Sequence, residues 1–434
     1  MRNKLIVISL DALIFEDLKY LREKPTFSML ISGGAMVERM KSIYPTLTYP
    51  CHTTMATGCY PDKHGIVNNT YVSFDENPPW IFEHKNVKCE DILDVCKRAG
   101  LKTASVGWPV TGNHKSVDYL VNECWPDAGA PIEAYREAYL DNGTPNWLFD
   151  ETVEPFLWLR VGRKQPESSY FLTRVSAQII RKYQPDILTI HLGNVDSYRH
   201  KTGVFSELVQ KGLDECENML TMLVHAAKDA GIFEQTNFVV TADHGQLNTT
   251  RNVNLNCLFV SEGLIKLNGD GSVKEFSAWC HESGMSAQIY LNNPDDKELK
   301  QKVYNLLKEK RDEGIWGISE VYTPEELHKM HLDGDFTFVV ETDGFTSFSD
   351  DWSGAYAKAM PLSLCGCIGG NHGYHPDKAA RPPFIAYGPD FIKGAVLPNA
   401  DLVDGAPTYA KILGVELKNA DGRPLTELIK KGDE

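Results

Sequence analysis

Acidic and imidazole side chains that could bind a metal ion recur at four separated places in this 434-residue chain. Three of these places come directly after an apolar, β-branched run that is typical of a buried strand, namely KLIVISL, DILTIHL and NFVVTA. Three aspartates and three histidines form a ligand set that suits zinc or a similar divalent ion. The six candidates are, in chain order, Asp11, Asp196, His200, Asp243, His244 and His372.

A stretch rich in hydroxyl groups supplies a candidate nucleophile. Residues 42–69 read SIYPTLTYPCHTTMATGCYPDKHGIVNN, in which CHTTMATG has the length and final glycine of a short helix. Thr48 is therefore expected near the N-terminus of that helix, where unpaired N–H groups and the helix dipole favour an anion. A threonine hydroxyl is a poor nucleophile unless it is deprotonated, which a bound metal ion favours. Thr48 is thus either a nucleophile that attacks phosphorus or a plain helix cap.

Each of the metal-type positions also has an ordinary structural explanation. Asp11 could cap a helix, and Asp196 with His200 could form a surface pair four residues apart. The Asp243–His244–Gly245 sequence could be a simple turn, and a histidine in a glycine-rich loop is usually solvated. Their joint occurrence favours one common site, because ligands of open α/β sheets bind beyond the carboxyl ends of the strands.

The alternation of apolar runs predicts the fold class. Strand-like runs alternate with helical patterns, which indicates an α/β fold with a mostly parallel sheet flanked by helices on both faces. The regular alternation of strand-like and helical patterns stops between residues 252 and 343, where patterns of short strands and helices predict a small α+β insertion. We therefore expect a catalytic core made of residues 1–251 and 344–434. The strand-like runs begin at residues 4, 101, 186 and 236, and the helical patterns cover 89–100, 169–185 and 206–231.

Composition and charge restrict the partners. Hydrophobic residues make up 42% of the chain, as in ordinary globular proteins, and the formal net charge of −15 argues against polymeric nucleic acid or an anionic membrane. No apolar run reaches the roughly 18 residues of a membrane span. Without a recognisable secretory leader, the ten scattered cysteines, of which Cys365 and Cys367 are closest, predict reduced thiols and a cytoplasmic location. The expected partner is a small-molecule substrate.

The collected motifs resemble the alkaline phosphatase superfamily, and specifically its nucleotide pyrophosphatase/phosphodiesterase branch. YPTLTYPCHTTMATGCYPDKHGIVNN resembles the family's nucleophile segment, and VISLDA, DSYRH, ADHGQ and GGNHGYHP are similar to its metal motifs. LVDGAPTYAKILGV resembles the closing helix. The resemblance implies an alkaline-phosphatase-like core. It also implies a two-metal enzyme that hydrolyses phosphodiester or phosphoanhydride bonds through a phospho-threonine intermediate.

The resemblance further implies roles for individual residues. Thr48, in preference to Thr46, would be the nucleophile and would lie close to both metals. Asn69 would donate a hydrogen bond to a phosphoryl oxygen, and Tyr49 would pack against the organic group of the substrate. Two zinc ions are implied, one held by Asp196, His200 and His372 and the other by Asp11, Asp243 and His244. Cys51 stands where relatives commonly have asparagine, and we expect it to alter packing rather than the metals.

Alternative activities share the same ligand set. A phosphomonoesterase needs additional positive donors for the extra charge of its substrate, and a phosphonoacetate hydrolase is a further possibility. Within the nucleophile segment, residues 42–69, Lys63 is the only lysine or arginine, and it is far from Thr48 in sequence. This pattern favours a diester. In a different class, the chain would be a zinc-stabilised binding protein without turnover, in which Thr48 only caps a helix.

Overall fold

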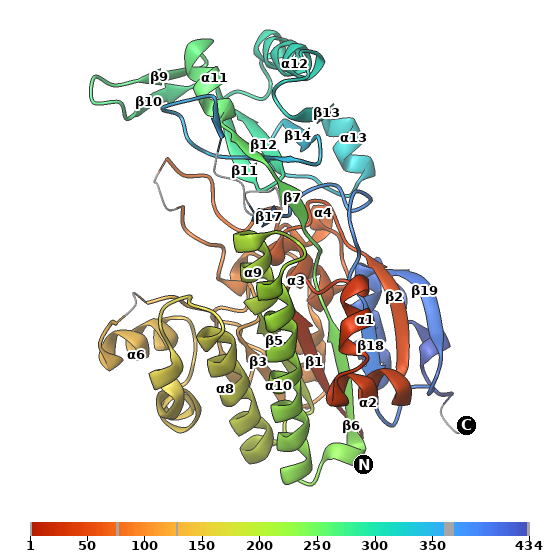
Figure 1. Ribbon diagram of the computed structural model, residues 1–434. Coiled ribbons are helices and arrows are strands. Elements are labelled where there is room, and N and C mark those ends of the chain that lie inside the picture. Colours follow the sequence, from red (N-terminus) through yellow and green to blue (C-terminus); the bar gives the residue numbers. More distant parts are fainter. Residues whose placement is uncertain (1, 75–77, 127–128, 360–368, 432–434) are drawn as a thin grey trace.

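The computed structural model describes residues 2–74, 78–126, 129–359 and 369–431 (Figure 1). Its centre is an eight-stranded sheet in which β18 is antiparallel to both its neighbours and the other strands are parallel to one another. This arrangement confirms the predicted α/β fold with a mostly parallel sheet. The strand order is β19 (Val396–Asp401), β2 (Ala35–Lys41), β18 (Phe384–Tyr387), β6 (Thr236–Thr241), β1 (Lys4–Leu10), β5 (Ile187–Leu192), β3 (Thr103–Val106) and β4 (Tyr119–Val121).

Helices cover both faces of this sheet, because alternate residues of the central strands point to opposite sides. Ile6 and Ile8 of β1 belong to one hydrophobic core, and Leu5 and Val7 belong to the other. The first core is closed by α2 (Pro25–Gly33), α8 (Glu167–Tyr183) and α10 (Glu207–Asp229). The second is closed by α3 (Thr48–Thr57), α5 (Ile92–Arg98) and α14 (Gly405–Leu413).

Local sequence signals explain where the helices begin and end. The Ser206 hydroxyl accepts a hydrogen bond from the Val209 N–H at the start of α10, and Asp91 caps α5 in the same way. Gly58 follows α3 with a φ of 69°, a left-handed conformation that glycine adopts without strain. Shorter helices are α1 (Leu18–Leu21), α4 (Pro61–His64), α6 (Ile132–Asp141), α7 (Asn146–Leu148) and α9 (Asn194–Thr202).

Residues 252–343 contribute a second, antiparallel sheet that lies beyond the carboxyl end of the first (Figure 1). Its strand order is β11 (Ala278–Ser283), β12 (Ser286–Leu291), β14 (Phe338–Thr342) and β13 (Ile318–Tyr322). A separate core that includes Trp279, Ile289 and Phe338 packs beneath it. Its neighbours are β9 (Ile265–Leu267), β10 (Val273–Phe276), α11 (Leu255–Ser261), α12 (Lys297–Asp312) and α13 (Pro324–Lys329).

Short strands connect this part to the core. β8 (Arg251–Val253) pairs with β15 (Thr346–Phe348) and β16 (Ala357–Ala359). β7 (Leu247–Thr249) pairs with β17 (Gly369–Asn371), which brings the segment before His372 beside the segment after His244. Over the described ranges, no helix combines the length and apolar character needed to cross a membrane. The eight cysteines in those ranges are free thiols, and Cys365 and Cys367 lie outside the described residues.

Candidate metal centre

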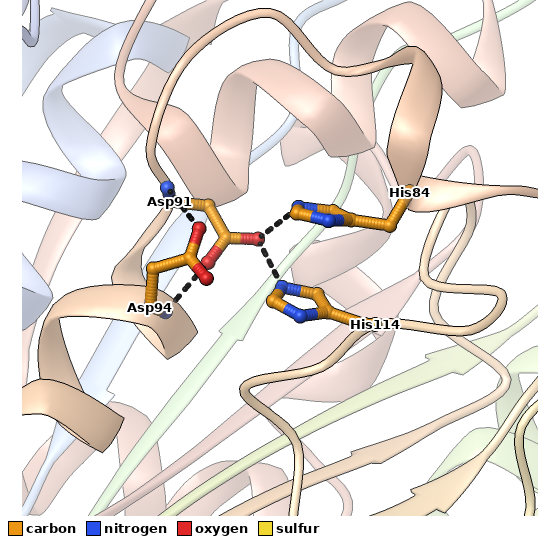
Figure 2. Close-up of side chains that lie close together, drawn as sticks. All are labelled: His84, Asp91, Asp94 and His114. Atoms are coloured by element: carbon orange, nitrogen blue, oxygen red, sulfur yellow. Dashed lines mark hydrogen bonds and ion pairs between the residues drawn. The ribbon is translucent and has the colours of Figure 1, made fainter.

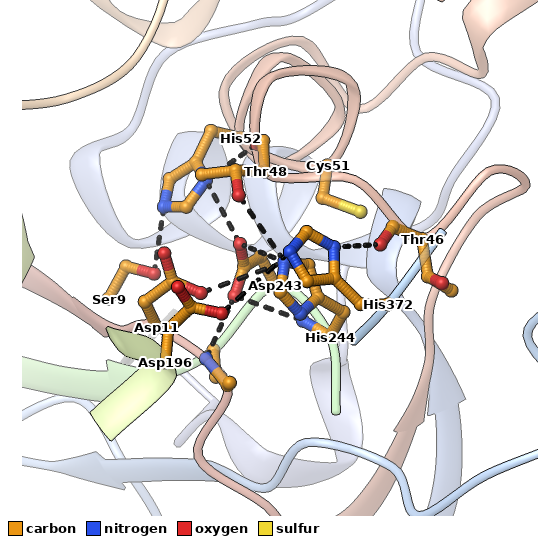
Figure 3. Close-up of polar contacts among 12 residues, drawn as sticks. Ser9, Asp11, Thr46, Thr48, Cys51, His52, Asp196, Asp243, His244 and His372 are labelled. Carbon is orange, nitrogen blue, oxygen red and sulfur yellow. Dashed lines mark hydrogen bonds and ion pairs between the residues drawn. The ribbon is translucent and has the colours of Figure 1, made fainter. Parts of the chain in front are cut away.

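The six predicted ligands, which are far apart in the sequence, lie together beyond the carboxyl ends of β1, β5 and β6. Figure 3 shows five of them: Asp11, Asp196, Asp243, His244 and His372. Asp11 directly follows β1, and His244 Nε2 lies 3.6 Å from its Oδ1. Asp196 Oδ1 lies 3.3 Å from His200 Nε2 and 3.8 Å from His372 Nε2. Asp243 Oδ2 lies 3.1 Å from His244 Nε2. The strand ends therefore bring these side chains to one edge of the sheet, as an open α/β fold permits.

The three histidines share one tautomer, which points their free lone pairs into the cluster. Nδ1 of each ring faces a main-chain carbonyl oxygen: His200 faces Gly370 at 2.9 Å, His244 faces Gly245 at 3.1 Å, and His372 faces Thr46 at 2.8 Å. A carbonyl oxygen only accepts, so Nδ1 carries the proton and Nε2 is left as an acceptor. This is the arrangement in which protein histidines bind metal ions.

Burial keeps two of these rings neutral. It lowers the pKa of His244 to about 4 and that of His372 to about 3. Burial alone would lower the pKa of His200 as well, but the Asp196 carboxylate offsets it and the pKa of His200 is raised. A neutral imidazole is the form that binds a cation.

The carboxylates lack the donors that buried anions require. Asp11 Oδ1 and Asp243 Oδ2 are buried, and neither has a hydrogen-bond donor within the described part of the chain. Burial raises the pKa of Asp11 well above its ordinary value, and the Asp196 and Asp243 carboxylates raise it further. Buried anionic oxygens without donors are costly unless a cation binds them. The donor set therefore fits divalent metal ions.

Distances divide the ligand atoms into two overlapping groups. Ligand atoms of Asp196, His200 and His372 all lie within 4.8 Å of one another, and so do those of Asp11, Asp196 and His244. The first group contains the three residues expected at one zinc. The second contains two residues expected at the other, with Asp196 in the place of Asp243. Asp243 nevertheless contacts His244 directly, and its Oδ1 accepts the Ala12 N–H at 3.3 Å.

Thr48 is the first residue of α3, and its side chain faces the cluster. The cap residue of this helix is Leu47, and no side-chain hydrogen bond caps the helix. Thr48 Oγ1 instead lies 3.4 Å from His244 Nε2. Thr46 differs, because its hydroxyl donates to the Tyr374 carbonyl oxygen at 2.9 Å and accepts the Gly373 N–H at 3.0 Å. The geometry leaves the Thr48 hydroxyl available for chemistry and commits the Thr46 hydroxyl to structure.

Asn69 and Tyr49 both line the pocket of about 540 Å³ that opens onto Thr48. Asn69 Oδ1 accepts the Tyr49 N–H at 2.8 Å, which turns the Asn69 amide nitrogen into the available donor. The Tyr49 hydroxyl donates to Glu123 Oε2 at 2.7 Å, and its ring centroid lies 5.1 Å from that of Trp80. Both side chains are thus held in place before a substrate arrives.

Several pocket residues were missed in the sequence analysis. Trp80 and Trp125 extend the aromatic wall, and Arg160 and Arg163 bring cations to it. Glu282 reaches the pocket from the second sheet. By contrast Lys63, the one lysine or arginine within residues 42–69, forms an ion pair with Asp421 and is absent from the pocket lining. The signal that could have found Trp125 is the polar, proline-bounded loop that follows β4, a strand that the sequence analysis did not predict.

A second layer of residues supports the ligands. His191 Nε2 lies 3.0 Å from Asp11 Oδ2, and the Gln246 amide donates to Asp196 Oδ1 at 2.5 Å. His52 belongs to α3, and its Nδ1 is 2.8 Å from the Thr48 carbonyl oxygen one helical turn earlier.

Cys51 is fully buried, and its thiol lies 3.2 Å from Ser42 Oγ. The Ser42 hydroxyl in turn donates to the Asp243 carbonyl oxygen at 2.6 Å. Cys51 therefore contacts the predicted ligand Asp243 only through Ser42, and it does not line the pocket.

Another histidine–aspartate cluster lies outside this centre, and it consists of His84, Asp91, Asp94 and His114 (Figure 2). His84 Nε2 lies 3.3 Å from Asp91 Oδ2 but has no hydrogen-bond partner in the described part of the chain, whereas His114 is fixed by hydrogen bonds. His84 and His114 stack at 3.6 Å, and both approach Asp91 Oδ2. His114 Nδ1 accepts the Ser116 N–H at 3.1 Å, so Nε2 carries the proton and donates to Asp91 at 2.9 Å. This tautomer is opposite to that of the three site histidines. It makes the cluster a structural link between the loop before α5 and residues 111–118.

Comparison with known proteins agrees with this geometry. The model of the family described as type I phosphodiesterase / nucleotide pyrophosphatase matches residues 5–375. The bovine protein named bis(5'-adenosyl)-triphosphatase ENPP4 is 26% identical over 420 residues, which cover 95% of this chain and 78% of that protein. Mouse ectonucleotide pyrophosphatase/phosphodiesterase family member 3 is 24% identical over 90% of this chain but only 40% of its own length.

The fold is also similar to solved structures. Murine ectonucleotide pyrophosphatase/phosphodiesterase 5, in an inactive form in complex with AMP, has a TM-score of 0.68 at 18% identity and covers 99% of this chain. The human protein of the same name gives the same TM-score and identity. Together with the family match over most of the sequence, these likenesses show that the chain belongs to the type I phosphodiesterase / nucleotide pyrophosphatase family.

Proposed function

We propose that this protein is a metal-dependent phosphodiesterase / nucleotide pyrophosphatase that uses Thr48 as its nucleophile. The observation that carries the proposal is the place of the Thr48 hydroxyl. It stands at a helix N-terminus, it caps nothing, and it lies 3.4 Å from the metal-type nitrogen of His244. The family match supports the reaction class. A zinc-stabilised binding protein without turnover needs neither this half-buried, uncapping hydroxyl nor the pocket that opens onto it.

Two divalent ions, zinc being the one that this donor set suits best, would stabilise the charge of the phosphoryl group and lower the pKa of the Thr48 hydroxyl. Asp196, His200 and His372 would hold one ion, and Asp11, Asp243 and His244 would hold the other. The N-terminus of α3 and the Asn69 amide nitrogen bind the phosphoryl oxygens. Thr48 Oγ1 forms a bond to phosphorus while the bond to the departing oxygen breaks. Water then cleaves the phospho-threonine and restores the hydroxyl.

A diester or anhydride substrate is favoured over a monoester. Asn69 is an uncharged donor in the pocket that opens onto Thr48, and four acidic residues line the same pocket, namely Asp11, Glu123, Asp196 and Glu282. Those carboxylates oppose the additional charge of a monoester dianion. Arg160 and Arg163 also line the pocket, so a phosphomonoesterase is the second candidate. The two candidates are distinguished by comparing the hydrolysis of a diester with that of a monoester.

Metal-loaded protein is expected to hydrolyse bis-p-nitrophenyl phosphate with a kcat/KM at least about 10-fold above that for p-nitrophenyl phosphate, because unpaired like charge costs more than about 1 kcal/mol. Phosphonoacetate serves as the third substrate, with release of inorganic phosphate as the readout. A preference for the monoester would indicate a phosphomonoesterase. Selective release of phosphate from phosphonoacetate would indicate a phosphonoacetate hydrolase. Bound zinc without turnover of any of the three would support the binding protein.

A further inference from the structure

Arg160 lies in the wall of the pocket as a buried cation without an acidic partner. Arg160 is only 7% exposed to solvent, although it lines the pocket. The guanidinium donates to Ser168 Oγ and to the Cys124 carbonyl oxygen, the latter at 2.7 Å. Its Nε has no acceptor, and it forms no ion pair with any carboxylate of the described residues. A buried charge without a counter-charge is costly, and a bound anion offsets that cost.

Arg163 lies in the same pocket, a few residues further along the chain, and it is held by aromatic rings. Its guanidinium carbon lies 3.8 Å from the ring centroid of Trp125 and 4.9 Å from that of Trp80. The two indoles themselves meet edge to face at 4.7 Å. Stacking covers the flat face of a guanidinium but leaves its N–H edge free to donate in the plane. In the described part of the chain, Arg163 has no ion pair either.

The stacking decides what the aromatic wall can bind. The indole faces that Arg163 covers are not available to an unsaturated ring of the substrate. The acid on the same wall, Glu123, is already bound to the Tyr49 hydroxyl at 2.7 Å. A group that reaches this wall therefore meets guanidinium donors, which match the planar oxygens of phosphate and carboxylate.

We propose that Arg163, together with Arg160, forms a subsite for a second anionic group carried by the organic part of the substrate. The preferred substrates are then phosphodiesters or anhydrides that bear another phosphate or a carboxylate. This inference rests on the proposed function, since it names a substrate class for the same pocket. Arg163 acts on specificity, and it does not touch the reacting phosphorus.

Two matched pairs of esters test the subsite. In the first pair, thymidine 5'-(p-nitrophenyl phosphate) is compared with the same ester carrying a 3'-phosphate. In the second pair, the phenyl ester of thymidine 5'-phosphate is compared with its 4-carboxyphenyl ester. Each pair is measured with the wild type, Arg163→Gln, Arg163→Lys and Lys164→Gln. Lys164→Gln is the matched control, because Lys164 is adjacent and pairs with Glu167 but does not line the pocket.

In at least one pair, Arg163→Gln is expected to lower kcat/KM for the anionic member about 10- to 100-fold more than for its partner, chiefly through KM. Arg163→Lys should retain much of the preference, and Lys164→Gln should leave the ratio within about 2-fold of wild type. Whichever pair responds identifies phosphate or carboxylate as the ligand. An equal loss for both members of both pairs, in a variant that keeps the wild-type Tm, would overturn the subsite. Failure of the metal-loaded wild type to cleave any of the four esters would instead overturn the proposed function.

Discussion

Thr48→Ala is expected to lower kcat by roughly 10⁴-fold or more while leaving bound metal near the wild-type amount, because removal of a nucleophile typically costs that much. Six other side chains are the proposed metal ligands, so we expect the cluster to stay intact in this variant. Turnover of bis-p-nitrophenyl phosphate and elemental analysis of the dialysed protein measure the two quantities together.

Thr53→Ala is the matched control for this variant. Thr53 lies on the same helix and is buried, whereas Thr48 is half-buried, and the Thr53 hydroxyl donates only to the Tyr49 carbonyl oxygen at 2.8 Å. Its loss should cost about 1 kcal/mol of stability and little activity. Full activity in Thr48→Ala, or a phosphoryl group trapped on Thr46 by acid quench, would rule out the assignment of the nucleophile.

Asp196→Asn is expected to lose both metal and activity. Asp196 Oδ1 lies 3.3 Å from His200 Nε2 and 3.8 Å from His372 Nε2, and Asp196 belongs to both groups of possible ligand atoms. An amide oxygen carries no charge to neutralise a divalent ion, so metal affinity should fall at least about 100-fold. Asp229→Asn is the control, because Asp229 pairs with Arg181 on the exposed surface. Titration of the metal-free proteins followed by calorimetry measures the difference, and equal affinities in both variants would contradict the ligand assignment.

The same titration has an expected pH dependence. The pKa values of Asp11 and His200 are raised in the metal-free protein, so at low pH each group holds a proton that the metal must displace. Affinity should therefore rise with pH until both groups are deprotonated, and metal binding should release protons. Removal of the ions by a chelator should lower Tm by roughly 5 °C or more, since ligands that bind only the folded state stabilise it.

The sequence was sufficient to predict that the side chains of this cluster lie together, and the reason is physical. A ligand that directly follows a buried strand has its position set by the strand, and parallel strands end at one edge of the sheet. Asp11 and Asp243 are placed in this way. The short helix that starts at Thr48 was readable because proline and glycine bound it.

The residues of the pocket wall could not be predicted from the sequence in this way. Arg163 and Trp125 reach each other through irregular segments, where no hydrophobic period fixes the direction of a side chain. The search for cations along the nucleophile segment found only Lys63, which pairs with Asp421 instead.

Parts of the sheet were missed as well. β2 contains Glu38, Arg39 and Lys41, and β19 contains Pro398, so neither has the apolar run of a buried strand. The division into residues 1–251 with 344–434 and an insertion at 252–343, together with the cytoplasmic location, stay predictions.

Anomalous diffraction from crystals of the zinc-loaded protein, recorded at the zinc edge, would locate the bound ions relative to Thr48. We expect two peaks, one bound by Asp196, His200 and His372 and the other by Asp11, Asp243 and His244, with Thr48 Oγ1 beside both. Peaks found only at the His84–His114 cluster, or no ordered zinc near Thr48, would contradict this expectation.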